Sequence, residues 1–165
     1  NKKLLFHGSK VSNFMGIMSQ GLKIAPAWAP STGLAYGKGI YLADMFSKSQ
    51  AYCDDYQIDP SIKHDKFMLM CEAALGKPFK TSECLDIEKA KKGYHSTEAI
   101  GSTKPDPDST IILPNGCSVP VGKLVDIPNP RGGWGSYPSE YIVYEESQAR
   151  LRYIIQFEAD AGYWQ

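Results

Sequence analysis

The sequence predicts an α+β fold whose β-sheets are mainly antiparallel. Apolar runs of strand length outnumber helical patterns, and the helices do not alternate with the strands one for one, as a doubly wound parallel sheet would require. Turn residues separate the runs, and Asn115-Gly116 is a dipeptide favoured in tight hairpins. The 165 residues, 42% of them hydrophobic, suit one domain with a single core.

Each expected strand is a short apolar segment bounded by turn or polar residues. The strongest lies at 67–75 and is followed by a Gly-Lys-Pro turn. The first strand leads directly into His7-Gly8-Ser9, and the strand at 140–144 begins with an acidic residue. The full set covers residues 4–6, 39–43, 67–75, 111–113, 117–121, 140–144 and 151–157.

Three short helices are expected from caps and periodicity. Ser12 or Asn13 is placed to cap the first and Asp44 to cap the second, because side-chain oxygens of these residues accept bonds from the first N–H groups of a helix. The third is a short amphipathic stretch around Leu85. The expected helices run from about 13 to 20, 45 to 53 and 82 to 92.

Composition excludes several classes of function. The 18 basic and 18 acidic side chains cancel, whereas a domain that held DNA on its own surface would usually be markedly basic. No apolar run approaches the roughly 18 residues of a membrane-spanning helix. The cysteines form no Cys-x-x-Cys pair, so we expect reduced, buried thiols and no metal site: Cys53, Cys71, Cys84 and Cys117.

Three familiar signatures come close and fail. Gly37-Lys38-Gly39 begins like the dinucleotide fingerprint, but Leu42 stands at the third glycine position, and the segment precedes a strand where the fingerprint must open a helix. The P-loop needs Ser or Thr after its Lys, and Gly39 follows Lys38. No Gly-x-Ser-x-Gly elbow is present in the sequence. Hydride transfer, NTP hydrolysis and acyl transfer therefore lose their usual sequence support.

Polar residues gather instead at the ends of apolar strands, in three stretches: H-G-S at 7–9, G-K-G-I-Y-L-A-D-M-F-S-K-S-Q-A-Y-C at 37–53, and E-Y-I-V-Y at 140–144. This ordered set resembles the His-Tyr-Glu signature of diphtheria-toxin-type ADP-ribosyltransferases, and most closely the catalytic domain of DNA-dependent poly(ADP-ribose) polymerases. The similarity spans nearly the whole chain. It implies the ADP-ribosyltransferase fold, in which two mainly antiparallel β-sheets pack together with a few short flanking helices.

The resemblance implies an enzyme that takes ADP-ribose from NAD+, releases nicotinamide and needs no metal. Glu140 would bond the 2′-hydroxyl of the nicotinamide ribose and stabilise the positive charge that builds there as the glycosidic bond opens. His7 would hold the adenosine ribose, and Lys48 would lie beside Glu140. The nicotinamide ring would stack between Tyr41 and Tyr52. The implied catalytic residues are His7, Tyr41, Lys48 and Glu140.

The same resemblance implies a clamp on the carboxamide of nicotinamide. The backbone of Gly8 and the hydroxyl of Ser49 would bond it, and a side chain at position 8 would block the approach of that backbone. Ser49 and Tyr52 are three residues apart, so a helix beginning at Asp44 would present both on one face. The implied NAD+-binding residues are Gly8, Ser9, Asn13, Lys23, Ala25, Gly33, Tyr41, Ser49 and Tyr52.

Several positions depart from the family pattern. Lys23 stands where the relatives have Arg, so its contact with adenosine or phosphate would be a point contact and not a bidentate fork. Ser139 replaces Asn before the glutamate. Leu34, Ala35 and Pro138 replace larger or aromatic residues of the acceptor pocket, which leaves polymer length and acceptor preference open.

The resemblance also sets expectations for the whole protein. Residues 1–165 would form one catalytic domain, without the helical regulatory subdomain and the DNA-sensing domains of full-length relatives. We expect a nuclear, monomeric protein of the DNA-damage response whose acceptors are proteins, histones and itself among them. A partner protein that completes the active site is expected, whereas direct DNA binding by this domain and membrane association are not.

Taken singly, these residues have ordinary structural explanations, since a histidine at a strand end and tyrosines in a strand or on a helix face are commonly core residues. Three alternatives stay open: a mono-ADP-ribosyltransferase, an inactive NAD+- or ADP-ribose-binding module, and a nicotinamide-dependent oxidoreductase. The presence of Glu140 argues against the inactive module, and the failed glycine fingerprint argues against the oxidoreductase.

Overall fold

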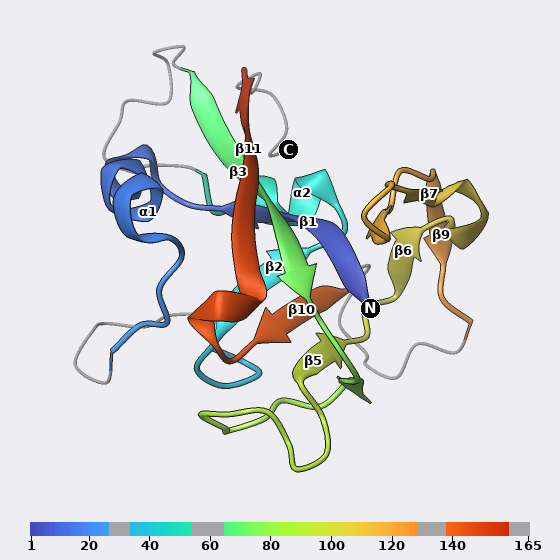
Figure 1. Ribbon diagram of the computed structural model, residues 1–165. Helices are drawn as coiled ribbons and strands as arrows, with labels where there is room; N and C mark the ends of the chain where they lie inside the picture. The colour runs from blue at the N-terminus through green and yellow to red at the C-terminus, as the bar shows by residue number, and fades with distance from the viewer. Residues whose placement is uncertain (27–33, 54–64, 129–137, 159–165) are drawn as a thin grey trace, which may run out of the picture.

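The computed structural model describes residues 1–26, 34–53, 65–128 and 138–158, and it confirms an α+β fold with mainly antiparallel sheets (Figure 1). The strands are β1 (Lys2–Gly8), β2 (Ile40–Ala43), β3 (Lys66–Ala74), β4 (Pro78–Thr81), β5 (Ser96–Ala99), β6 (Thr103–Pro105), β7 (Ile111–Ile112), β8 (Cys117–Val119), β9 (Leu124–Asp126), β10 (Glu140–Val143) and β11 (Ala149–Phe157). The helices are α1 (Phe14–Gln20) and α2 (Phe46–Gln50), with 3-10 turns η1 (Val11–Asn13), η2 (Pro107–Ser109) and η3 (Glu146–Gln148).

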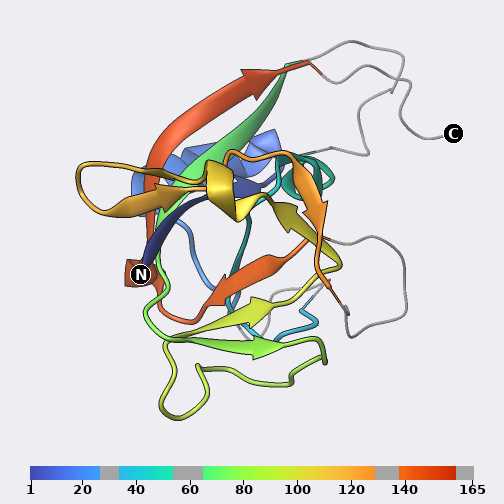
Figure 2. The same cartoon turned by 90° about the vertical axis from the view of Figure 1, so that its right-hand side faces the viewer.

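One sheet of nine strands carries most of the structure. Its path runs β11-β3-β1-β2-β10-β5-β4, and the hairpin of β7 and β8 joins it through β1. Among the described strands, the β1–β8 and β4–β5 pairs are parallel and the others antiparallel. Strands β6 and β9 form a separate two-stranded sheet, which Figures 1 and 2 show on the other side of the molecule from α1. The central strands β1, β2 and β10 bring the three sequence stretches of the predicted site together.

The largest core cluster lies on one face of these central strands. It contains fully buried side chains of β1, β3 and β10, such as Leu5, Leu69 and Val143, and Phe14 and Ile17 of α1 pack against it. Burial of this kind stabilises the fold by about 25 cal/mol for each Å² of apolar surface removed from water. Because packing against this core fixes the central strands, it also fixes the positions of the polar residues at the ends of these strands.

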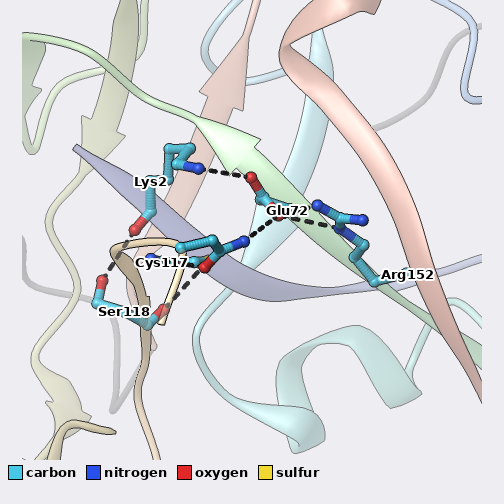
Figure 3. Close-up of polar contacts among 6 residues, drawn as sticks. Lys2, Glu72, Cys117, Ser118 and Arg152 are labelled. Atoms are coloured by element: carbon cyan, nitrogen blue, oxygen red, sulfur yellow. Dashed lines mark hydrogen bonds and ion pairs between the residues drawn. The ribbon is translucent and has the colours of Figure 1, made fainter. Parts of the chain in front are cut away.

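Glu72 of β3 joins four segments by polar contacts, shown in Figure 3. Its carboxylate lies 3.0 Å from Lys2 Nζ of β1, accepts a hydrogen bond of 2.9 Å from Arg152 Nε of β11, and accepts one of 3.2 Å from the side-chain amide of Asn115 in the β7–β8 turn. The hydrogen bonds with Arg152 and Lys2 hold the pKa of Glu72 below its usual value. This acid therefore stabilises the register of an edge strand, a central strand and a hairpin.

Two predicted helix caps are wrong. Asp44 precedes α2 but makes no capping bond, since its buried carboxylate accepts a hydrogen bond from the Tyr141 hydroxyl instead, and the helix covers only Phe46–Gln50. Asn13 stands at the start of α1 without a side-chain capping bond and donates to Ser9 Oγ. The expected end of the first helix is confirmed, because Gly21 terminates it with a φ of 78°.

The predicted helix at 82–92 is also wrong. Its segment is irregular because its backbone bonds to the loop before β2: Leu85 N–H donates to the carbonyl of Ala35, and the carbonyl of Ile87 accepts from Lys38 N–H. These tertiary hydrogen bonds replace the i to i−4 bonds of a helix. The four cysteines are free, and the expectation of burial is wrong for Cys84, which is exposed.

Candidate active site

The three predicted stretches line one cavity of about 190 Å³. An engineered cavity of about 150 Å³ holds a benzene ring, so this volume suits one flat six-membered ring. The cavity lies where the ends of β1, β2 and β10 meet α2. It is lined by His7, Gly8, Leu34, Gly39, Tyr41, Leu42, Ala43, Lys48, Ser49, Tyr52 and Glu140.

Glu140 and Lys48 form an ion pair at the wall of this cavity. Lys48 Nζ lies 2.9 Å from Glu140 Oε1, and the two side chains are 21% and 17% exposed. Burial alone would lower the pKa of Lys48, but the hydrogen bond and the negative charge of Glu140 outweigh it, so the pKa of the ammonium is raised. The adjacency that the resemblance implied for this pair is observed. Lys48 stays charged and holds the carboxylate at one place in the cavity.

Tyr41 presents its ring to the cavity while its hydroxyl is occupied elsewhere. The hydroxyl donates to the carbonyl of Gly37 at 2.7 Å and accepts from the backbone N–H of Tyr36 at 2.9 Å. Burial, together with the nearby Tyr144 and Glu140, raises the pKa of Tyr41, which keeps the phenol neutral. The ring is therefore a rigid apolar wall, and its hydroxyl is not available as an acid or base.

Gly8 and Ser49 pack against each other at the same cavity. A Cβ placed on Gly8 would overlap the carbonyl oxygen of Ser49, so any larger residue would push α2 away from β1. The reason for glycine seen here is thus helix packing, whereas the open approach to a ligand that the resemblance implied stays a prediction. The Ser49 side chain is buried, and Tyr52 is 53% exposed at the rim of the cavity. Since α2 ends at Gln50, Tyr52 lines the cavity from the turn after the helix.

His7 lies between this cavity and a second one, because it lines both. Its Nδ1 is 2.8 Å from the backbone carbonyl oxygen of Tyr41. A carbonyl only accepts, so Nδ1 carries the proton and Nε2 of the neutral ring is left as an acceptor. Burial lowers the pKa of His7, although the bond to Tyr41 opposes this, and the neutral form is favoured. A ring in this state can accept a hydrogen bond from a hydroxyl group of a ligand.

The second cavity is larger, about 450 Å³, and adjoins η1, α1 and the loop that follows α1. Three predicted ligand residues line it: Ser9, Asn13 and Lys23. Lys23 forms an exposed ion pair of 2.8 Å with Glu146, and Glu146 also accepts from the backbone N–H of Ile24. A phosphate that took Lys23 would therefore compete with Glu146 for it.

One predicted ligand residue that the structure describes does not line either cavity, and another cannot be assigned. Ala25 is a half-buried loop residue and is not among the lining residues of either one. Gly33 lies outside the described residues. Of the residues that depart from the family pattern, Leu34 lines the first cavity, whereas Ser139 is buried and accepts from the backbone N–H of Gly101. Ala35 and Pro138 are likewise absent from the lining of both cavities.

Sequence reasoning missed three residues at or next to the site. Tyr36 supplies the N–H that holds the Tyr41 hydroxyl. Gly39 allows β2 to approach β10 closely, since a Cβ there would overlap Ile142 and the carbonyl of Val143. Asp44 was taken for a helix cap and is a buried partner of Tyr141. Only the position of Asp44, at the end of a strand between two predicted site segments, could have drawn attention to it.

Comparison with known proteins identifies the class of domain. A family model described as the poly(ADP-ribose) polymerase catalytic domain matches residues 1–159. Poly [ADP-ribose] polymerase 1 of Danio rerio is 42% identical over 99% of this chain, and poly [ADP-ribose] polymerase 2 of Arabidopsis thaliana is 42% identical over 94% of it. The poly [ADP-ribose] polymerase of Drosophila melanogaster is 39% identical over 99%. The chain therefore belongs to the poly(ADP-ribose) polymerase catalytic-domain family, whose enzymes take ADP-ribose from NAD+.

The matched region is a small part of these relatives. This chain covers 16% of the Danio rerio and Drosophila melanogaster proteins and 24% of the Arabidopsis thaliana protein. Within the residues that the structure describes, no cluster of His, Cys, Asp and Glu side chains could hold a metal ion. No described helix has the length and apolar character needed to cross a bilayer.

Proposed function

We propose that this domain is an NAD+-dependent ADP-ribosyltransferase that attaches ADP-ribose to protein side chains and extends it into a polymer. One observation carries the proposal: a carboxylate held by a lysine lines the same ring-sized cavity as two tyrosines, a buried serine and a glycine. These six residues come from β1, β2, α2, the turn after α2 and β10. Their convergence matches what cleavage of a nicotinamide–ribose bond requires.

The proposed binding mode uses both cavities. Nicotinamide occupies the smaller one, with its ring against Tyr41 and Tyr52 and its carboxamide on Gly8 and Ser49. Adenosine occupies the larger one, and His7, which borders both, accepts a bond from a ribose hydroxyl through Nε2. Ser9, Asn13 and Lys23 then bind the adenosine half or its phosphates.

The first step of the proposed reaction needs a negative charge near the ribose and does not need a general base. Nicotinamide leaves with the electron pair of the glycosidic bond and becomes neutral, while positive charge develops on the ribose. Glu140 stabilises that charge and binds the ribose 2′-hydroxyl. The acceptor forms the new bond to the ribose carbon and loses a proton, which Glu140 helps to remove when the acceptor is a hydroxyl of a growing chain.

Removing the charge at position 140 tests the assignment. Glu140→Gln should lower the rate constant for nicotinamide release by about 100-fold or more, as loss of one transition-state stabiliser does elsewhere. Glu72→Gln is a matched control, because Glu72 is also a lysine-paired strand residue, with a side chain 12% exposed, and does not line the cavity. The assay should run near pH 8. Equal rates for the two variants would contradict the proposal.

The products distinguish polymer formation from the transfer of single units. Incubation of the chain with NAD+ should give a ladder of products on a gel. A single-unit adduct would instead make this a mono-ADP-ribosyltransferase, the alternative to which Leu34 at the cavity wall gives some weight. Nicotinamide release tests the reaction, and the ladder tests the polymer.

The setting of the activity is proposed from the family alone. The relatives are poly(ADP-ribose) polymerases 1 and 2, which supports a nuclear role in the response to DNA damage, with the protein itself among its acceptors. DNA would be sensed outside these residues, whose basic and acidic side chains balance. Localisation of the tagged full-length protein before and after DNA breakage tests this placement.

A further inference from the structure

Three side chains, from β1, β10 and the residue after β2, form a line of polar contacts on the core side of the central sheet. Lys3 of β1 donates to the Tyr141 hydroxyl of β10 at 3.1 Å, and that hydroxyl donates to Asp44 Oδ2 at 3.0 Å. The ammonium of Lys3 also lies 4.7 Å from the centre of the Tyr141 ring. We call these three residues the Lys3–Tyr141–Asp44 relay. It reaches across β1, the end of β2 and β10.

The relay is buried at considerable cost. Tyr141 and Asp44 are 3% and 4% exposed, and Asp44 Oδ1 has no hydrogen-bond partner among the described residues. Burial raises the pKa of Asp44 to about 6, which means that its ionised form opposes folding near neutral pH. Groups that reduce stability while being well packed are common where function needs them. Stability alone therefore does not account for this carboxylate.

The relay fastens the same two segments as the Lys48–Glu140 ion pair, but from the opposite face. In the β2–β10 pairing, Glu140 lies opposite Ala43 and Tyr141 opposite Leu42, and neighbouring residues of a strand point to opposite faces. Glu140 therefore faces the cavity, and Tyr141 faces the core. At the other end, Asp44 precedes α2 and Lys48 lies within it. Two contacts thus hold β10 against the β2–α2 junction.

We propose that Asp44 is a positioning residue of the transferase, which acts through Tyr141 to fix the place of Glu140 relative to Lys48 and the cavity. The inference rests on the proposed function, since a position for Glu140 matters only if Glu140 acts on a ligand. Asp44 touches no substrate. The Asp44 carboxylate sets where β10 lies. If β10 shifts, the Glu140 carboxylate is displaced, and the reaction rate falls steeply because charge stabilisation depends on geometry.

Removal of the relay contacts should separate turnover from binding. Tyr141→Phe and Asp44→Ala should each lower kcat for nicotinamide release by about tenfold, while the KM for NAD+ changes by less than about twofold. The Kd of a benzamide for the Gly8 and Ser49 side of the cavity should stay unchanged. Asp44→Asn, which keeps an acceptor for Tyr141 but not the charge, should recover part of the lost kcat.

Ser96→Ala is the control for a purely structural effect. It removes another fully buried hydroxyl of the sheet, bonded to the carbonyl of Leu75 at 2.8 Å, on β5 beside β10. It should lower the Tm as Tyr141→Phe does and leave kcat unaltered. If the relay variants change only the Tm, as this control does, the positioning role is overturned.

A double-mutant cycle gives a second, independent reading. Tyr141→Phe and Lys48→Met should together lower kcat by less than the product of their separate effects, because both displace the same carboxylate, while their effects on the Tm should add. Multiplicative effects on kcat would overturn the proposal. Absence of nicotinamide release by the unaltered protein would overturn the proposed function and this inference together, whereas normal kcat in the relay variants would overturn the inference alone.

Discussion

At the scale of single residues, the site is held mainly by backbone atoms. The His7 ring is oriented by the carbonyl of Tyr41, and the Tyr41 hydroxyl is held by the loop at Tyr36 and Gly37. Since sheet pairing fixes that backbone, these two rings are positioned before any ligand arrives, which lowers the entropy lost on binding. Asp44 differs, because its described partner is another side chain, the Tyr141 hydroxyl.

The buried state of Asp44 predicts an unusual pH dependence of stability. Its pKa rises from 3.8 to about 6 on folding, so the folded state binds the proton more tightly than the unfolded state. Protonation of Asp44 therefore favours the folded state. This contribution to stability is complete below about pH 4 and is lost as the pH rises through about 6. At about pH 8 the ionised form costs the folded state up to about 3 kcal/mol.

Asp44→Asn, which is uncharged at every pH, should therefore raise the free energy of unfolding near pH 8 and make little difference near pH 4. Urea unfolding of both proteins across this range gives the difference directly, and subtraction cancels the titration of other groups such as His7. A variant that is destabilised equally at both pH values would show that burial does not perturb Asp44.

At the scale of elements, short segments took their form from their neighbours. The 82–92 segment has the pattern of a helix but bonds through Leu85 and Ile87 to the loop before β2. Helix α2 is shorter than its sequence suggests, and Asp44 turns inward instead of capping it. Local propensity is worth tenths of a kcal/mol for each residue, so a few tertiary contacts override it.

The contacts of Glu72 with β1, β11 and the β7–β8 turn, here called the Glu72 junction, make a testable contribution to the stability of the fold. Glu72→Gln weakens its contacts with Lys2 and Arg152 and should lower the free energy of unfolding by about 1 to 2 kcal/mol at neutral pH. Because folding lowers the pKa of Glu72, the loss should be full above the usual value of 4.5 and should shrink only below it, as the pH falls through the lower pKa of the folded carboxylate. Chemical denaturation of both proteins at neutral pH and at a pH well below 4.5 measures this loss.

Glu88→Gln is the matched control for this prediction. Glu88 also forms a lysine ion pair, with Lys38 at 2.8 Å, but its side chain is 76% exposed and joins no strands. It should leave the unfolding midpoint nearly unchanged. A loss as large as that of Glu72→Gln would mean that the four-segment junction has no special effect.

At the scale of the whole molecule, the net charge bears on whether this chain can bind DNA. With 18 basic and 18 acidic side chains, it has no net attraction for a polyanion. The same balance does not disturb the site, where the one carboxylate needed for the proposed chemistry is paired locally with Lys48. We therefore expect no response of residues 1–165 to DNA on the ground of their net charge.

Nicked DNA should not change the rate of nicotinamide release by the 165-residue chain. The comparison is made at low and at physiological salt, because a weak electrostatic contact would show itself first at low ionic strength. A rate enhancement by DNA at either salt concentration would contradict the prediction and place a DNA-responsive surface on this domain.

Sequence alone was enough to predict the fold class, most of the strands and the three stretches that meet at the site. Strand periodicity and turn residues such as Asn115-Gly116 carry that information locally. The resemblance then implied the residues that bind nicotinamide and its ribose. Of these, Gly8, Tyr41, Ser49, Tyr52 and Glu140 are now seen around one cavity. Their roles in binding and catalysis stay predictions.

The contacts that hold the residues around that cavity could be seen only in the folded molecule. The bond that fixes the His7 tautomer, the packing of Gly8 on α2 and the Lys3–Tyr141–Asp44 relay each join residues distant in the chain. A sequence pattern reports which face of an element is apolar, but not which buried acid meets which hydroxyl. That pairing depends on strand order and register, and the register between β2 and β10 is set by the packing of the whole core.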